Sequence, residues 1–328
     1  MTIDRRAFVT AAVALGVAGA VRAQAVKAIP VIFHTDIGGD IDDTWALLLL
    51  LRRPELDLKL VVTEGGNAIY RGRLAARLLT LAGRGDVAIA TGADGHDDAA
   101  AQSDWIGDFQ LAGYPGRVTN DGAQAMIDVI SASSEPVTVI SVGPATTVAA
   151  ALARAPGIAA KARFVGMFGS VRAGYGAGKP PEAEYNVKQD AAALHAVFAA
   201  PWDCTITPLD TCGLLVLDGA GFQRLRASTD PFARACIANS EAWLPHATWM
   251  PADFDLRQHT STLFDAVAVV MACDESDLVM EALPLSVTGD GMTVIDPAHG
   301  RTVHVATAWR DLDGFKAKMI DSLTSRPA

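Results

Sequence analysis

The sequence predicts an α/β fold, in which a mostly parallel central sheet is flanked by helices. Two observations lead to this fold class. Apolar, β-branched runs alternate with helical patterns along most of the chain, and the runs are continuously apolar, as in strands buried on both faces. Half of the 328 residues are hydrophobic, which is enough for a large core in one domain, and we assign residues 26–328 to that domain.

The elements of this fold are predicted in order along the chain. The predicted strands are residues 31–34, 58–63, 87–91, 137–142, 163–168 and 204–209. The predicted helices between them are residues 43–51, 71–82, 121–133, a helix from 145 onward, and 191–199. The first helix ends before Pro54, which cannot continue it, and Asp121 is suited to cap the third.

The last third of the chain has a different pattern. Helices are predicted at 232–244, 263–273 and about 312–323. Between the last two helices, residues 283–309 hold two or three short strands separated by Gly and Asp turns. This pattern predicts a small C-terminal antiparallel hairpin beside the mostly parallel sheet.

The first 25 residues have the pattern of an export signal. Arg5 and Arg6 stand side by side, and the apolar run 7–21 that follows is too short to cross a bilayer comfortably. The run ends in "VRAQA", which offers small-residue cleavage positions. The paired arginines indicate a twin-arginine-type signal peptide, so we expect a periplasmic or secreted protein with no integral membrane segment after processing.

Charge and cysteine content narrow the function class. The formal net charge of −10 argues against a broad nucleic-acid or membrane surface, and it suits a small-molecule enzyme or a cation site. The four cysteines form no CxxC and no zinc-binding frame. The four cysteines are Cys204, Cys212, Cys236 and Cys273. Two states are open for them: a pair could be oxidised after export, or all four could stay free thiols in a chain that folds before export.

An acidic cluster follows the first predicted strand. The stretch "TDIGGDIDD" contains Asp36, Asp40, Asp42 and Asp43 between an apolar strand and an apolar helix. Ligands bind outside the carboxyl ends of parallel strands, and carboxylates this close repel one another unless a cation compensates. Carboxylates are hard oxygen ligands suited to Ca²⁺ or Mg²⁺. The alternative is that these residues only cap the helix, whose dipole favours negative charge.

Six motifs in order resemble the inosine-uridine-type nucleoside hydrolases. They cover nearly all of the chain after the signal. The motifs are "TDIGGDIDD", "VVTEGGN", "GRGDVAIATGAD", "VTVISVGPATTVAAAL", "EYNVKQDAAA" and "FDAVAV". The resemblance implies a nucleoside hydrolase-like fold and Ca²⁺-dependent hydrolysis of ribonucleosides to ribose and free nucleobase. It also implies a homo-oligomer, although no surface can be assigned to it from the sequence.

The resemblance assigns roles by position in these motifs. Asp36 would be the base that activates water and also a calcium ligand. The other calcium ligands would be Asp43, Asp265 and the carbonyl of Val142. The ribose hydroxyls would be held by Asp42, Asn67 and Asn186, and the 5′ side of the sugar by Glu184.

The sequence departs from the family pattern near the sugar site. His34 stands where the family usually has an additional Asp before the base, and Asp40 has no counterpart in the shorter family motif. Gly178 falls near a family Asn that contacts the 5′-hydroxyl. The side chains that could replace that Asn on the same loop are Arg172, Tyr175 and Lys179.

The largest departure concerns the leaving group. Phe264 occupies the position of the histidine that protonates the departing nucleobase in the family. The candidates to replace it are His246 and His259, with Trp249 or Trp243 as surfaces on which a base could stack.

Two other function classes are open at this point. Loss of the leaving-group histidine suggests a non-catalytic periplasmic nucleoside- or riboside-binding protein that keeps the metal site. The Asp-rich loop after the first strand also suggests a phosphatase with an Asp-x-Asp nucleophile, although "TDIGGDIDD" lacks the usual D-x-D-G-T order.

Overall fold

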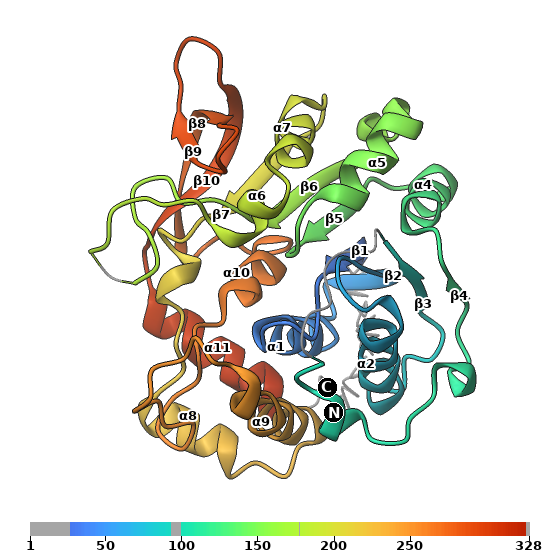
Figure 1. Cartoon of the computed structure of the whole chain (residues 1–328), viewed down its shortest axis with the longest axis vertical. Coiled ribbons are helices and arrows are strands. Elements are labelled where there is room, and N and C mark those ends of the chain that lie inside the picture. Colours follow the sequence, from blue (N-terminus) through green and yellow to red (C-terminus); the bar gives the residue numbers. More distant parts are fainter. Residues whose placement is uncertain (1–26, 93–99, 177, 326–328) are drawn as a thin grey trace, which may run out of the picture.

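The central feature of the fold is one large sheet. The computed structural model describes residues 27–92, 100–176 and 178–325, and the predicted export signal at 1–25 lies outside them. The described residues form ten strands in the order β4-β3-β2-β1-β5-β6-β7-β10-β8-β9 (Figure 1). These strands are β1 (Ile29–Thr35), β2 (Leu56–Thr63), β3 (Ala88–Thr91), β4 (Val118–Thr119), β5 (Val137–Ser141), β6 (Ala162–Met167), β7 (Cys204–Thr207), β8 (Leu278–Val287), β9 (Thr293–Ile295) and β10 (Arg301–Trp309).

The strand order reverses next to β1. This strand pairs in parallel with β2 on one side and with β5 on the other. From β1 the chain builds the sheet outward through β2, β3 and β4, and it then returns to build the other half from β5. Ligands of open parallel sheets bind beyond the carboxyl ends of the strands at such a reversal. The segments that follow Thr35 and Ser141 are therefore the expected walls of a site.

The predicted C-terminal antiparallel strands are confirmed, and they extend the main sheet. β10 pairs antiparallel with β8, and β8 with β9. β10 also pairs in parallel with β7, through His304 opposite Thr205. The antiparallel strands therefore extend the sheet at the edge beyond β7, away from the reversal of strand order at β1.

Helices cover both faces of the sheet. They are α1 (Asp42–Leu50), α2 (Ala68–Leu81), α3 (Ser103–Ile106), α4 (Gly122–Ala132), α5 (Thr146–Arg154), α6 (Tyr185–Gln189), α7 (Ala191–Ala199), α8 (Gly219–Arg226), α9 (Pro231–Trp243), α10 (Phe264–Met271) and α11 (Leu312–Thr324). Short 3-10 turns are η1 (Leu111–Gly113), η2 (Pro156–Lys161), η3 (Cys212–Leu214) and η4 (Leu244–His246).

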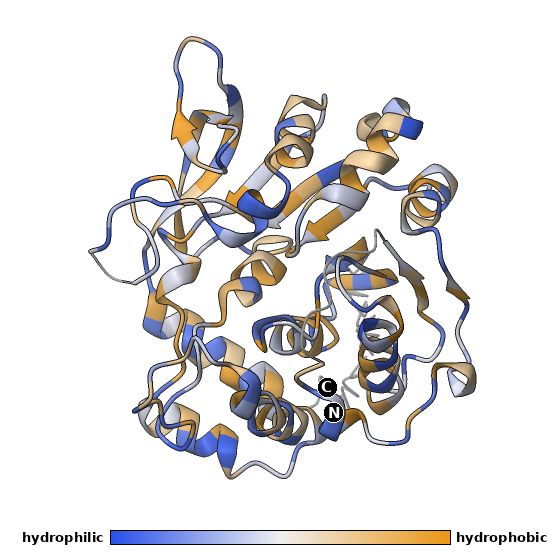
Figure 2. Cartoon of the chain, in the orientation of Figure 1, coloured by the Kyte–Doolittle hydropathy of each residue, from blue (hydrophilic) through white to orange (hydrophobic). Residues whose placement is uncertain are grey.

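The core is divided by the sheet into two layers. Within β1, Val31 and Phe33 pack in the layer under α1, α2, α9, α10 and α11, whereas Ile32 packs under α4, α5 and α7. Both layers are continuous and apolar, and the central strands are accordingly hydrophobic in Figure 2. Burial on both faces explains why the strands read as uninterrupted apolar runs rather than as an alternation.

Most of these elements lie where the sequence predicts them. The predicted strands up to 204–209 and all the predicted helices agree with the structure to within three residues at the predicted ends. Helix α8 was not predicted, because Gly219 and Gly221 in its first turn lower its helix propensity. Asp121 caps α4 as expected, accepting a hydrogen bond from Gln124 N at 3.0 Å.

The loop between β1 and α1 is held against α2. Gly38 has a φ of 101°, and a Cβ there would lie 2.6 Å from the Tyr70 ring, so this position requires glycine. The Tyr70 hydroxyl donates to the Gly38 carbonyl at 3.0 Å, and Arg71 Nη1 donates to the Ile37 carbonyl at 2.8 Å. These contacts fix the path of the acidic stretch before it enters α1.

The structure shows the state of the cysteines, which the sequence left open. All four cysteines are free thiols, and three of them are buried. Burial raises the pKa of the Cys204 thiol, which makes it a poor nucleophile. Across the described ranges, no helix is both long and apolar enough to cross a membrane.

Candidate active site

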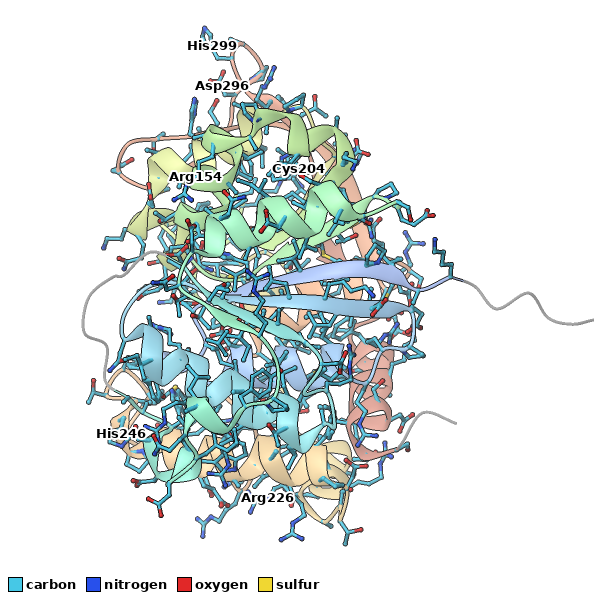
Figure 3. All side chains as sticks on the ribbon, turned by 90° about the vertical axis from the view of Figure 1, so that its right-hand side faces the viewer. Arg154, Cys204, Arg226, His246, Asp296 and His299 are labelled. Atoms are coloured by element: carbon cyan, nitrogen blue, oxygen red, sulfur yellow. The ribbon has the colours of Figure 1, made fainter. Side chains whose placement is uncertain are left out.

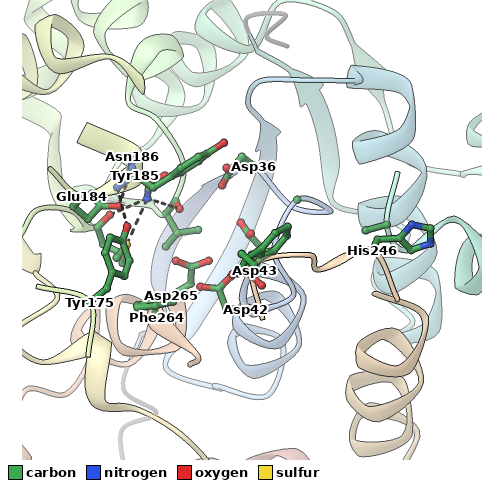
Figure 4. Close-up of a pocket in the computed structure, with 16 residues that line it drawn as sticks. Asp36, Asp42, Asp43, Tyr175, Glu184, Tyr185, Asn186, His246, Phe264 and Asp265 are labelled. Carbon is green, nitrogen blue, oxygen red and sulfur yellow. Dashed lines mark hydrogen bonds between the residues drawn. The ribbon is translucent and has the colours of Figure 1, made fainter. Parts of the chain in front are cut away.

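A cavity of about 410 Å³ lies beyond the carboxyl ends of β1 and β5. It is lined by Asp36, Gly39, Asp40, Asp42, Asp43, Ala101, Val142, Met167, Tyr175, Glu184, Tyr185, Asn186, His246, Trp249, Phe264 and Asp265 (Figure 4). Most of these residues come from segments that follow a strand or begin a helix. The reversal of strand order thus brings together residues that are far apart in the sequence.

Three buried carboxylates form the floor of this cavity. Asp42 and Asp43 lie in the first turn of α1, and Asp265 lies in the first turn of α10, which packs beside α1. One carboxylate oxygen of each lies within 4.8 Å of the others. The Thr35 hydroxyl donates a hydrogen bond to Asp43. Hard oxygen atoms at this spacing fit a divalent cation such as Ca²⁺.

The electrostatics of the floor favour a bound cation. Burial, together with the neighbouring carboxylates, raises the pKa of Asp42, Asp43 and Asp265 well above the usual range. Burial also raises the pKa of Asp40 to about 6, and Asp40 lines the cavity rather than a solvated surface. A cation at the floor would favour the ionised form of all these groups.

Asp36 and Val142 follow the two central strands and both line the cavity. Asp36 directly follows β1, and Val142 directly follows β5. The next residue, Gly143, packs so closely that a Cβ there would lie 2.7 Å from Asp36 N and 2.9 Å from Asp36 Oδ1. The absent side chain at Gly143 therefore allows the two strand ends to converge.

Glu184 and Asn186 form one side wall at the start of α6. Glu184 accepts hydrogen bonds from Asn186 N at 2.8 Å and from Gly169 N at 3.0 Å. Burial raises the pKa of Glu184 to about 7, so this group is partly protonated near neutral pH. Asn186 Nδ2 donates to the Val142 carbonyl at 3.0 Å, which leaves one lone pair of that carbonyl for another partner.

Aromatic side chains cover the same wall. Tyr175 meets Phe264 edge to face, with ring centroids 5.9 Å apart, and its hydroxyl accepts a hydrogen bond from Tyr185 N at 2.9 Å. Of the three side chains expected near the 5′-hydroxyl, Tyr175 lines the cavity, whereas Arg172 forms a bidentate pair with Glu281. The third, Lys179, is exposed outside the lining.

Tyr185 is a lining residue that the sequence analysis missed. The sequence offered one indication of this, because Tyr185 stands between the two predicted site residues Glu184 and Asn186. Consecutive residues in the first turn of a helix lie close together around the end of that helix. Figure 4 shows its side chain extending over the cavity toward Asp36.

The leaving-group candidates separate into two groups. His246 and Trp249 line the cavity. Figure 4 shows His246 on the side opposite Tyr175. Trp249 is 59% exposed and meets the buried Trp243 ring edge to face at 5.9 Å. Figure 3 shows His246 at the side of the molecule toward which the parallel strands point.

Two predicted site residues lie outside the cavity lining in the described part of the chain. His259 packs edge to face against Phe254, with centroids 5.0 Å apart, and its Nδ1 lies 3.0 Å from the Thr260 carbonyl. Asn67 caps α2, where its side-chain oxygen accepts a hydrogen bond from Tyr70 N at 3.0 Å. One polar atom of each side chain is therefore engaged in a local contact, His259 Nδ1 and Asn67 Oδ1.

The close approach of Gly143 to Asp36 gives a direct test of the site geometry. In Gly143→Ala the added methyl must displace Asp36, so we expect a loss of about 1–3 kcal/mol in stability and cation binding weakened about tenfold or more. Gly157→Ala is the matched control, since no atom lies within 4 Å of a Cβ there. Calorimetric titration with Ca²⁺ measures both variants, and wild-type affinity in Gly143→Ala would refute this geometry.

Comparison with curated proteins finds relatives of similar length. The chain is 30% identical over 221 residues to the pyrimidine-specific ribonucleoside hydrolase RihA of Salmonella agona, covering 63% of this chain and 68% of that protein. It is 33% identical over 215 residues to RihA of Salmonella newport, covering 62% and 68%.

Solved structures agree with the fold, and a family model assigns the family. A plant nucleoside hydrolase, PpNRh1, superposes with a TM-score of 0.77 at 21% identity, covering 91% of this chain and 100% of that chain. A purine-preferring ribonucleoside hydrolase from Gardnerella vaginalis superposes with a TM-score of 0.72 at 20% identity, covering 90% and 99%. These likenesses support the fold. The family model described as inosine-uridine preferring nucleoside hydrolase matches residues 31–317. The chain therefore belongs to the inosine-uridine preferring nucleoside hydrolase family.

Proposed function

We propose that this nucleoside hydrolase uses Ca²⁺ to hydrolyse the N-glycosidic bond of ribonucleosides, giving ribose and a free nucleobase. One observation carries the proposal. A single cavity joins three buried carboxylates to Asp36, Glu184 and Asn186, in a chain of this family. The family match argues against the phosphatase alternative.

The residues present fit a calcium ion. Asp36, Asp43, Asp265 and the carbonyl of Val142 would hold it, and all four offer hard oxygen atoms. The floor of the cavity offers no nitrogen or sulfur ligand, which argues against zinc. When bound, the cation supplies positive charge that favours ionised carboxylates, attracts ribose oxygens and makes water easier to deprotonate.

Three polar residues would hold the sugar. Asp42 on the floor and Asn186 on the wall would accept from or donate to ribose hydroxyls. Glu184, with its pKa of about 7, can either donate to or accept from the 5′-hydroxyl. Hydrogen bonds of this kind bind ribose and select against sugars that lack the matching hydroxyl. Asn67, which the resemblance also assigned to the ribose, is left out of this set because it lies outside the cavity lining.

The chemistry requires one base and one acid. Asp36 would accept a proton from water as the water oxygen bonds to C1′. The bond between C1′ and the nitrogen of the nucleobase breaks by way of an oxocarbenium-like transition state of the sugar, and the nucleobase leaves with the bonding electrons. His246 would then donate a proton to the departing base, in place of the family histidine at Phe264.

A panel of purine and pyrimidine ribonucleosides tests this function. We expect the purified protein to release ribose from at least one of them, to stop when Ca²⁺ is chelated, and to resume when Ca²⁺ is restored. Asp36→Ala should abolish release. Tight nucleoside binding with bound metal but no ribose release would instead favour the non-catalytic binding protein.

We also propose that residues 1–25 direct export of the chain to the periplasm or the medium.

The role of His246 is tested with two leaving groups. His246→Ala should lower kcat for natural nucleosides by about 100- to 10,000-fold, the usual contribution of a general acid. It should leave a nitrophenyl riboside nearly unaffected, because nitrophenolate departs without protonation. His259→Ala is the matched control, since His259 lies outside the cavity lining. Equal effects of His246→Ala on both substrates would contradict the assignment.

A further inference from the structure

A buried polar network joins the carboxyl ends of β1, β2 and β5. His34, in β1, is 0% exposed, and both of its ring nitrogens have partners. Nδ1 lies 2.8 Å from the Ser141 hydroxyl oxygen on β5, and Nε2 lies 3.1 Å from Glu64 Oε2, just after β2. One side chain thus connects the carboxyl ends of the three strands around the reversal.

Glu64 extends the network to a helix. Its Oε2 also accepts a hydrogen bond from Thr147 N at 2.7 Å, in the first turn of α5, and its Oε1 accepts from Gly65 N at 3.1 Å. Burial opposes ionisation of Glu64, but the hydrogen bonds from His34 and Thr147 outweigh it and lower its pKa. The lowered pKa favours the ionised carboxylate, and both of its oxygens accept hydrogen bonds, a buried arrangement that is costly to disturb.

The network adjoins two of the proposed calcium ligands. His34 precedes Asp36 by two residues, and Ser141 directly precedes Val142. The backbone ties the same residues, since Val142 N donates to the His34 carbonyl at 2.8 Å. A shift of β1 against β5 would separate the Asp36 carboxylate from the Val142 carbonyl.

The network and the floor carboxylates lie on opposite sides of the sheet. His34 points to the same face as Ile32, under α4 and α5, where Thr147 also lies. Asp42 and Asp265 come from α1 and α10, which cover the other face. The two strand ends are therefore fixed from one face, while the repelling carboxylates are presented from the other.

We infer that His34, acting with Ser141 and Glu64, is a positioning residue that holds Asp36 and the Val142 carbonyl at the spacing a calcium ion requires. This inference rests on the proposed calcium site. It gives a role to the departure at His34, where the family usually has an Asp. The Ser141 hydroxyl can donate or accept, so its contact with Nδ1 is available in either protonation state of the ring.

The test measures calcium affinity separately from stability. Ser141→Ala removes one hydroxyl from the network. Thr138→Val is the matched control, because it removes a buried hydroxyl from the same strand at the end away from the cavity, where Thr138 pairs with Arg163. His34→Ala removes both ring contacts, and His34→Gln restores an amide that can reach toward Glu64.

Calorimetric titration of the full-length, metal-free proteins gives the main readout. Ser141→Ala and His34→Ala should bind Ca²⁺ about 10- to 100-fold more weakly than wild type. His34→Gln should recover part of that affinity, and Thr138→Val should bind like wild type. With saturating Ca²⁺, the KM for ribonucleoside should return toward the wild-type value, because the ion then fills the site regardless.

The outcomes separate the two proposals. Wild-type affinity in Ser141→Ala and His34→Ala, with lower thermal stability only, would overturn the positioning role and leave the calcium site intact. Equal weakening in Thr138→Val would overturn it as well, since the effect would then come from strand stability. Absence of calcium binding in the wild-type protein would overturn the proposed function, and the positioning role with it.

Discussion

Repulsion among three buried carboxylates is the constraint on which the rest of the site depends. Asp42, Asp43 and Asp265 have oxygens within 4.8 Å of one another. At an effective dielectric constant of about 20, each ionised pair at this distance is unfavourable by about 3 kcal/mol. Three such pairs oppose folding by about 10 kcal/mol, which is comparable to the whole stability of a typical domain. The metal-free site must therefore hold protons, whereas a bound cation removes the need for them.

The fold brings the three carboxylates together by placing the first turns of two helices and the ends of two strands at one point. The carboxylates begin α1 and α10, where the helix dipole favours negative charge. Asp36 and Val142 reach the same point from β1 and β5, where Gly143 leaves room for close approach. The buried His34 contacts tie these strands from the opposite face. The floor carboxylates, the two strand ends and the His34 contacts therefore all lie at the reversal of strand order next to β1.

The sequence predicted the frame of the site from the connectivity of the strands together with the family resemblance. Polar residues that follow parallel strands must lie at one edge of the sheet, which places Asp36, Glu184 and Asn186 in one cavity. Residues whose role depends on side-chain direction were not predictable in this way. Asn67 follows a strand too, but its side chain turns back to cap α2. The partners of His34 come from two other strands, and only the folded sheet brings them together.

The central claim is that one cation replaces the protons on the floor carboxylates, and its pH dependence tests it directly. Without metal, the raised pKa values mean that the folded chain binds protons more tightly than the unfolded chain, so stability falls as pH rises above about 4. Bound Ca²⁺ would keep these groups ionised in the folded chain, which removes that pH dependence above about pH 5. The measurement is Tm with Ca²⁺ minus Tm with chelator, from pH 5 to pH 8, because surface acids affect both forms alike. The account predicts a difference that widens steadily with pH, and a difference that is absent or constant would contradict it.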